Sequence, residues 1–228
     1  QLYLTLFDGN VSNNIRCTST ATLSTGTWYH VGFSYDGSGS ETGLKLYIDG
    51  SPAAVTQAEV GTYVAMHNLS DELRIGSFNY HTDRFANGKI DEPAIFGSEL
   101  SAAQFLAIYN SGEPASLTSY SPIGWWRFEE GTGISIADSS GNGHTATLTN
   151  GPTFSTDVPI ALTNTYSVNF DGIDDYATIA DANDLSFGNG SSDSSFSISC
   201  WVKASDLTSV RFLSKTTSNT DGEWLFAT

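Results

Sequence analysis

Apolar and polar residues alternate over short stretches along most of this chain of 228 residues. Residues 2–7 (LYLTLF) show the pattern, with Leu2, Leu4 and Leu6 falling on one side. Because successive side chains of a strand point to opposite faces, this period predicts β-strands that bury one face. Comparable patterns predict further strands at residues 14–18, 28–35, 44–48, 73–76, 88–96, 125–128, 166–170, 176–179, 196–203, 210–215 and 223–227.

Turn-forming residues separate the predicted strands. Asp49-Gly50 is a strong signal for a two-residue hairpin. Asp171-Gly172 predicts a second, solvated hairpin, with Gly172 at positive φ. Pro93 lacks an N–H group, so its strand is expected to lie at a sheet edge or to contain a bulge.

One stretch has the signals of a short helix. Ser101 is a good N-cap, and Gln104 lies three residues on, as in a capping box. Phe105, Leu106 and Tyr109 then share a face, and Gly112 is expected to stop the helix before Pro114. A single short helix in such a chain is expected to pack outside a sheet or close one end of it.

Composition narrows the class of protein. A hydrophobic fraction of 39% is enough for a core, and no apolar run is long enough to span a bilayer. The net charge of −16 argues against binding to nucleic acid or anionic membranes, and allows cation binding. Cys17 and Cys200 both lie on predicted core faces; they could form a disulfide, although two buried thiols are the favoured interpretation. A chain that opens with Gln1 is expected to be a fragment or a processed product.

Several motifs in the first half carry a family resemblance. They are WYHV with YDG, LKLYIDG, LRIG, GKIDE and LSAAQ, within residues 28–37, 44–50, 73–76, 88–92 and 100–104. In order and spacing they resemble the C-terminal half of a laminin-G-like, concanavalin-A-like jelly-roll domain. Pro93 departs from the family pattern, in which an apolar residue usually continues the strand.

The second half resembles the N-terminal half of the same family. It has a Trp-rich strand at 125–128, an Asp-x-Ser-Gly-Asn-Gly loop at 138–143, a Phe-Asp-Gly turn at 170–172 and a Phe-x-Ile-x-x-Trp-Val strand at 196–202. The resemblance implies an all-β, two-sheet antiparallel jelly-roll sandwich with one short helix. Its halves, residues 1–114 and 123–228, stand in swapped order around a link at 115–122. The chain is then either a circular permutant or two half-repeats of a tandem array.

The loop at residues 138–144 is the first candidate site. Calcium prefers six to eight oxygen ligands on a bent loop, which Asp138, Asn142 and His144 could supply. The resemblance implies a structural calcium that joins this loop to the strand at 90–92, with Asp91 as second carboxylate and Glu129 as a weaker candidate. The alternative is that Asp138 and Asn142 only stabilise an Asx turn. The acidic turn at 170–176 could also hold a cation, although a solvated hairpin is favoured there.

The loop at residues 78–85 (FNYHTDRF) is the second candidate site. Sugar sites combine aromatic rings, which stack on pyranose faces, with planar polar groups that bind hydroxyls. Asn79, Tyr80, His81, Asp83 and Arg84 offer such a combination. The alternative is that these aromatic rings only pack onto the sandwich.

No catalytic residues are predicted. Glycoside hydrolases need two carboxylates on either side of the scissile bond, whereas Asp91 and Glu92 are adjacent and point to opposite faces of their strand. The leading hypothesis is a non-catalytic extracellular recognition or adhesion module, on a cell or virion surface, that binds a glycan or a surface protein. The alternative is a structural repeat of a surface fibre, stalk or virion appendage that contacts neighbouring copies of itself.

Overall fold

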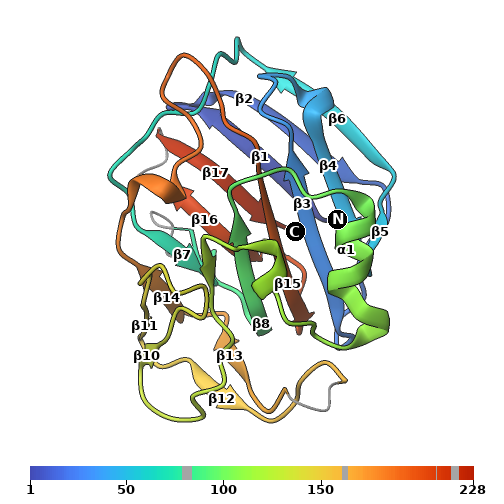
Figure 1. Cartoon of the computed structure of the whole chain (residues 1–228), viewed down its shortest axis with the longest axis vertical. Coiled ribbons are helices and arrows are strands. Elements are labelled where there is room, and N and C mark those ends of the chain that lie inside the picture. The colour runs from blue at the N-terminus through green and yellow to red at the C-terminus, as the bar shows by residue number, and fades with distance from the viewer. Residues whose placement is uncertain (79–83, 161–163, 209, 217–220) are drawn as a thin grey trace.

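Two antiparallel sheets packed face to face form the body of the protein (Figure 1). The computed structural model describes residues 1–78, 84–160, 164–208, 210–216 and 221–228. Among these residues the larger sheet has nine strands. In order across the sheet they are β10 (Ser135–Ile136), β11 (Ala146–Thr149), β14 (Tyr176–Ile179), β7 (Leu73–Ile75), β16 (Arg211–Thr216), β17 (Gly222–Ala227), β1 (Tyr3–Asp8), β2 (Asn10–Ser19) and β6 (Val55–Val60).

The smaller sheet has eight strands within the same described residues. Seven follow one another across the sheet: β12 (Thr153–Ser155), β13 (Ser167–Asp171), β8 (Asn87–Phe96), β15 (Phe196–Ala204), β3 (Tyr29–Tyr35), β4 (Leu44–Ile48) and β5 (Ser51–Pro52). The eighth, β9 (Gly124–Trp125), pairs with the end of β8. The predicted fold class, an all-β two-sheet antiparallel sandwich with a short helix, is therefore confirmed.

The core fills the space between the two sheets. Leu2, Leu4 and Leu6 are completely buried, as their alternation predicts. Phe33 of β3 meets Phe226 of β17 edge to face, with ring centroids 5.3 Å apart, so the two sheets touch directly through aromatic rings. Burying each such side chain stabilises the fold by about 1.5–3 kcal/mol.

Strands from the two halves of the chain are interleaved in both sheets. In the larger sheet β7 lies between β14 and β16, and β17 pairs with β1. In the smaller sheet β8 lies between β13 and β15, and β15 pairs with β3. Tyr3 lies opposite Ala227 in the β1–β17 pair, so the two chain ends are neighbours, as the N and C marks in Figure 1 show.

The predicted helix forms as α1 (Ala102–Tyr109) on the outer face of the smaller sheet. Its capping box is present, since the Ser101 hydroxyl accepts from the Gln104 backbone N–H while the Gln104 side chain accepts from the Ser101 N–H. Phe105 and Ile108 are the buried residues of α1. The prediction for Leu106 is wrong: this side chain is 57% exposed.

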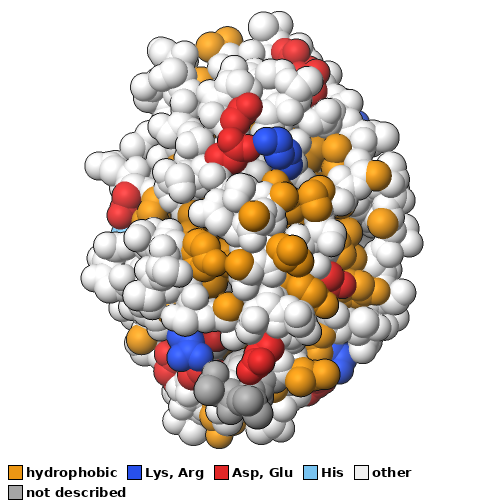
Figure 2. Space-filling model, turned by 45° about the vertical axis from the view of Figure 1, so that its right-hand side comes forward, with side chains coloured by type: hydrophobic (Ala, Val, Ile, Leu, Met, Phe, Trp, Pro, Cys, Tyr) orange, Lys and Arg blue, Asp and Glu red, His pale blue; other side chains and the backbone are white. Residues whose placement is uncertain are grey.

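The helix also ends earlier than predicted. Asn110 adopts a left-handed conformation with φ of 47° and caps α1, two residues before Gly112. A 3-10 turn, η2 (Asn110–Gly112), follows. Three more such turns are η1 (Glu41–Gly43), η3 (Thr118–Tyr120) and η4 (Asn183–Leu185). Figure 2 turns the side that carries α1 towards the viewer; apolar side chains gather over the middle of this face, with few charged groups among them.

Two turn predictions have different outcomes. The hairpin at Asp49-Gly50 is confirmed, since it joins β4 to β5 with positive φ at both residues. The hairpin at Asp171-Gly172 is wrong, because β13 belongs to the smaller sheet and β14 to the larger one. Gly172 does have a positive φ of 79°, and it takes the chain from one sheet to the other.

Pro93 lies at a bulge in a central strand. The register of β8 against β15 shifts between Ser199 and Trp201, so that Glu92 and Pro93 together oppose Cys200. Glu92 has a positive φ of 49° there. The bulge that the sequence predicts as one of two alternatives is therefore present.

Two further expectations concern aromatic and sulfur-containing residues. The aromatic strand predicted at 125–128 is wrong in extent, because β9 ends at Trp125 and Phe128 has a positive φ of 59°. Cys17 and Cys200 are buried free thiols, as favoured.

Among the helices of the described residues, none is long and apolar enough to cross a membrane.

Candidate functional site

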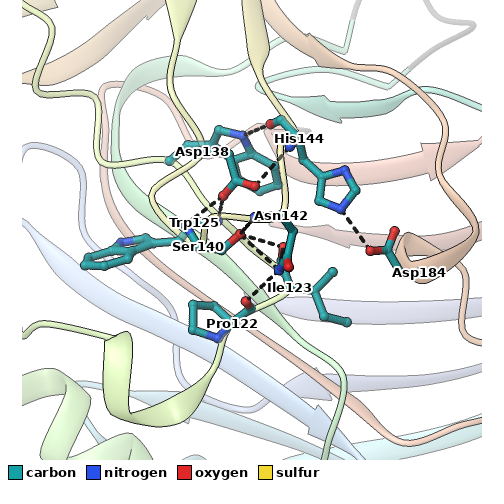
Figure 3. Close-up of polar contacts among 9 residues, drawn as sticks. Pro122, Ile123, Trp125, Asp138, Ser140, Asn142, His144 and Asp184 are labelled. Carbon is teal, nitrogen blue, oxygen red and sulfur yellow. Dashed lines mark hydrogen bonds and ion pairs between the residues drawn. The ribbon is translucent and has the colours of Figure 1, made fainter.

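The loop at residues 138–144 forms a network of hydrogen bonds (Figure 3). One carboxylate oxygen of Asp138 accepts from the backbone N–H groups of Trp125 at 3.1 Å and Ser140 at 2.9 Å. The other accepts from the His144 N–H at 3.0 Å. The bond to Ser140, two residues on, is an Asx turn.

The other two loop residues predicted as calcium ligands are also engaged. The Asn142 amide donates to the Ile123 carbonyl at 2.8 Å, and the His144 carbonyl accepts from the Trp126 indole at 2.6 Å. The His144 ring lies 3.0 Å from Asp184. Burial acts to raise the pKa of Asp138, but the hydrogen bonds that its carboxylate accepts outweigh burial and lower this pKa. The loop thus stabilises the negative charge of Asp138 through backbone N–H groups, and its role as a calcium site stays a prediction.

Asp91 and Glu129, the other two predicted ligands, lie at a second place. Asp91 is completely buried and accepts from the Glu92 N–H at 2.9 Å and the Asn164 amide at 2.6 Å. Glu129 accepts from the backbone N–H groups of Thr165 at 2.9 Å and Tyr166 at 3.3 Å. Both carboxylates therefore hold the consecutive residues 164–166 from different strands and loops.

The two places are connected through one residue. Trp125 donates its backbone N–H to Asp138, and its indole N–H donates to Glu92 at 2.5 Å. Glu92 also pairs with Arg127 at 3.1 Å. Because no described ion pair joins Asp91 to a cation, Asp91 differs from its neighbour Glu92.

The electrostatic environment of Asp91 favours the binding of a proton or a metal ion to its carboxylate. Burial raises the pKa of Asp91 well above its usual value, and the nearby Glu92 and Glu129 carboxylates add to this against the Asn164 hydrogen bond. The buried Oδ1 of Asn164 has no hydrogen-bond partner among the described residues. A buried carboxylate beside an unpartnered amide oxygen is a donor set that suits calcium, which binds carboxylate and amide oxygens.

The acidic turn between β13 and β14 is another cluster of oxygens. Carboxylates of Asp171, Asp174 and Asp175 lie within 4.8 Å of one another. Asp171 accepts from the Ile173 N–H at 2.8 Å, and Asp175 accepts from the Asp171 N–H at 3.0 Å. These bonds account for the turn. Asp171 and Asp174 are exposed and Asp175 is buried, and exposed acidic groups are common without a metal.

A groove of about 420 Å³ lies on the outer face of the larger sheet. Its apolar floor consists of Tyr3, Phe7, Phe78 and Leu225. Three arginines complete the lining together with small polar groups: Arg16, Arg84 and Arg211. Among the described residues that line the groove, none is acidic.

Strand register brings these distant residues together. Thr5 of β1 lies opposite Arg16 of β2 on one side and Leu225 of β17 on the other. In the next row, Ala227 of β17 lies between Tyr3 and Arg211. Directly opposed residues share a face, so both rows present their side chains to the groove.

Two of the arginines lie over aromatic rings of the floor. The guanidinium carbon of Arg211 is 5.8 Å from the centroid of the Tyr3 ring, and that of Arg84 is 6.0 Å from the Phe78 ring. Such cation–π contacts hold the guanidinium groups against the rings. Arg16 is exposed and has no ion pair among the described residues.

The predicted sugar-binding loop reaches this groove at both of its ends. Asn79, Tyr80, His81 and Asp83 lie outside the described residues. Arg84 and Phe78, which flank them, both line the groove, and the Phe78 N–H donates to the Arg84 carbonyl at 3.3 Å. Sequence reasoning missed Tyr3, Arg16 and Arg211. The alternation of residues 2–7 could have placed Tyr3 on the outer face, but only the register places the arginines beside it.

Family comparison agrees with the fold of the first half. Residues 1–105 match a family described as the concanavalin A-like lectin/glucanases superfamily. The predicted resemblance to this superfamily is therefore confirmed over these residues, which supply β1 to β8 and the start of α1. A search of curated proteins and a search of solved structures each found no match to the chain. The superfamily suggests a carbohydrate- or protein-binding module.

Proposed function

We propose that this protein is a non-catalytic recognition module that binds a glycan through the groove on the outer face of the larger sheet. The observation that carries the proposal is the aromatic floor lined with planar guanidinium groups. A half-buried ring such as that of Tyr3 can stack on a sugar face, and planar donors such as Arg84 can bind hydroxyls. A surface protein is the other class of ligand that the family supports.

The position of the carboxylates supports a binding role over an enzymatic one. Glycoside hydrolysis needs two carboxyl groups on either side of the substrate. The described lining of the groove contains no carboxylate, and the adjacent pair Asp91 and Glu92 is buried in the smaller sheet. We also place the module outside the cell, on a cell or virion surface, because laminin-G-like domains often work there.

Binding is tested with a glycan array probed by the wild-type protein and by two matched variants. Tyr3→Ser removes a ring of the floor, and Tyr176→Ser removes a half-buried ring that stacks under Arg74 outside the groove. We expect Tyr3→Ser to abolish the glycan signal and Tyr176→Ser to retain it. No glycan signal from the wild type, or equal loss in both variants, would contradict the proposal.

We further propose a structural calcium held by Asp91, Glu129 and the amide oxygen of Asn164. What supports it is the buried carboxylate beside an unpartnered amide oxygen. Bound calcium would supply the positive charge that these oxygens otherwise lack, and would hold residues 164–166 against β8. Asp138 would then act as a neighbour that orients Trp125.

Thermal melting in calcium, in magnesium and in chelator tests this site. At calcium concentrations one hundred times the Kd, the free energy of unfolding should rise by about 2.7 kcal/mol. Asp91→Asn should remove this rise, whereas Asp138→Asn and Asp171→Asn should keep it. If the rise disappears in Asp171→Asn instead, calcium binds the acidic turn, and if calcium has no effect on the wild type, the proposed site is wrong.

A further inference from the structure

Basic residues are few in this protein and are unevenly placed. The chain has nine Lys and Arg against 25 Asp and Glu, and a net charge of −16. Three of its arginines nevertheless line one groove in which no described residue is acidic. On a surface dominated by carboxylates, such a local excess of positive charge needs a reason.

The other basic side chains show how this protein normally uses positive charge. Each of them pairs with a carboxylate within 4 Å: Lys45 with Glu99, Arg74 with Glu72, Arg127 with Glu92, Lys89 and Lys203 with Asp157, and Lys215 with both Asp181 and Glu223. Arg16, in contrast, is exposed in the groove with no ion pair among the described residues. Its charge is therefore available to a ligand.

The guanidinium group has the geometry for one class of ligand. Its planar set of N–H donors matches the two oxygens of a carboxylate or sulfate, and such charge-assisted pairs are about twice as strong as neutral hydrogen bonds. Arg84 is held over the Phe78 ring, so part of the ordering cost of binding is already met. In the apolar floor, the half-buried Tyr3 ring offers a surface on which a sugar ring can stack.

We infer that the groove selects an anionic saccharide, one whose sugar rings bear carboxylate or sulfate groups. This inference rests on the proposed glycan-binding function and names the ligand class of that same groove. A sugar ring would stack on the half-buried Tyr3 while the anionic groups pair with Arg16 and Arg84. Uronic acids and sulfated sugars share this chemistry.

Calorimetry with three oligosaccharides of matched length tests the inference: an oligogalacturonate, a sulfated dextran oligomer and a neutral maltooligosaccharide. We expect the anionic sugars to bind at least about tenfold more tightly than the neutral one, since hydrogen bonds to charged groups are the stronger ones. Comparison of the two anionic sugars decides between carboxylate and sulfate. Raised salt should weaken both anionic complexes.

Two variants locate the effect. Arg16→Gln removes an exposed charge from the groove and is expected to weaken the anionic sugars at least about tenfold while leaving the neutral one unchanged. Arg74→Gln is the matched control, since Arg74 pairs with Glu72 and lies over Tyr176, outside the lining of the groove. Arg74→Gln removes the same positive charge and should change the binding of neither the anionic sugars nor the neutral one. Arg84→Lys keeps the charge without the planar group, and its affinity for the anionic sugars should lie between those of Arg16→Gln and the wild type.

The outcomes separate this inference from the function on which it rests. Equal binding of neutral and anionic sugars, lost in Tyr3→Ser, would overturn the anionic selectivity and leave glycan recognition standing. Equal weakening by Arg16→Gln and Arg74→Gln would also overturn it, because the effect would then be one of net charge. Binding of an acidic peptide with no binding of any sugar would overturn both.

Discussion

At the scale of single residues, His30 shows how burial sets a protonation state. The side chain of His30 is completely buried under α1, with its Nε2 2.7 Å from the Ser199 hydroxyl. The Trp201 ring lies 5.2 Å away and the Tyr109 ring 6.1 Å, measured between centroids. Burial lowers the pKa of His30 to about 3, because no charged group offsets the loss of water.

The low pKa of His30 predicts a loss of stability in acid. The folded-state value lies below the unfolded value of about 6.5, so the contribution of neutral His30 is fully present above pH 6.5 and is lost as the pH falls towards 3. At pH 5 the loss amounts to about 2 kcal/mol. We expect denaturant unfolding of the wild type to show this loss relative to His30→Gln, measured at pH 7 and pH 5.

Comparing the wild type with His30→Gln removes the contributions of other titratable groups. Glu223, whose pKa burial raises to about 7 against the charge of Lys215, changes stability in the opposite direction over part of this range. It is present in both proteins, so its contribution cancels in the difference. A difference that does not change with pH would show that His30 does not carry the effect.

At the scale of elements, α1 depends on a glycine beneath it. A Cβ added to Gly32 of β3 would collide with the Phe105 ring, and would lie 2.9 Å from the Ile198 carbonyl oxygen. The backbone of β15 cannot move without breaking its pairing with β3. Phe105 of α1 must therefore shift away from the sheet if any side chain is present at position 32.

Gly32→Ala is expected to destabilise the fold by about 1–3 kcal/mol through this overpacking. Ser34→Ala is a matched control on the same strand, because it adds no atoms at a position that is likewise completely buried. Thermal melting of both variants, with near-ultraviolet circular dichroism for the aromatic residues under α1, measures the effect. Unchanged melting of Gly32→Ala would show that α1 is free to lift from the sheet.

Local sequence signals predicted α1 and the strands well, and pairings between distant strands poorly. The capping box at Ser101 and the alternation at Leu2, Leu4 and Leu6 depend on neighbours in the chain, which the sequence displays directly. Whether β13 and β14 form a hairpin depends on which sheet each one joins, and nothing at Asp171-Gly172 encodes this. The same limit applies to the predicted site residues, because the groups that contact them come from other strands.

The groove illustrates this limit for function. Arg16 and Arg211 come from opposite ends of the chain. The alternation within each strand does not show that its outer face lines a groove. Only the pairing of β2, β1, β17 and β16 gathers them into one lining. The loop at 78–85 was a useful signal because Phe78 and Arg84 do reach the groove, although most of the residues that line it lie in strands.

At the scale of the whole molecule, the order of the two halves is the main question. The sequence left two explanations, a circular permutant or half-repeats of a tandem array. In the structure strands of both halves are interleaved in each sheet. Residues 123–228 alone would lack β7 and β8, and residues 1–114 alone would lack β15, β16 and β17. We propose that the halves pair within one chain and that the protein is a monomer in solution.

A chain with the family order of halves tests this proposal. It joins Thr228 to Gln1 by a short glycine linker, which Tyr3 opposite Ala227 allows, and opens between Ala115 and Ser116 in the link. We expect a monomer by sedimentation with a melting temperature within a few degrees of the wild type. The control opens the chain inside β15, between Cys200 and Trp201, and should not fold. Association of either the wild type or the rejoined chain into larger assemblies would favour the tandem interpretation.

The β1–β17 pair also has a mechanical consequence. Since the two chain ends leave from the same end of an antiparallel pair, a tension applied between Gln1 and Thr228 loads its hydrogen bonds one after another. Bonds that are loaded in series open singly, as in a zipper, and resist far less force than bonds sheared together. A tether through these two ends would therefore peel β1 and β17 apart at low force, and would expose the floor of the groove before the rest of the sandwich unfolds.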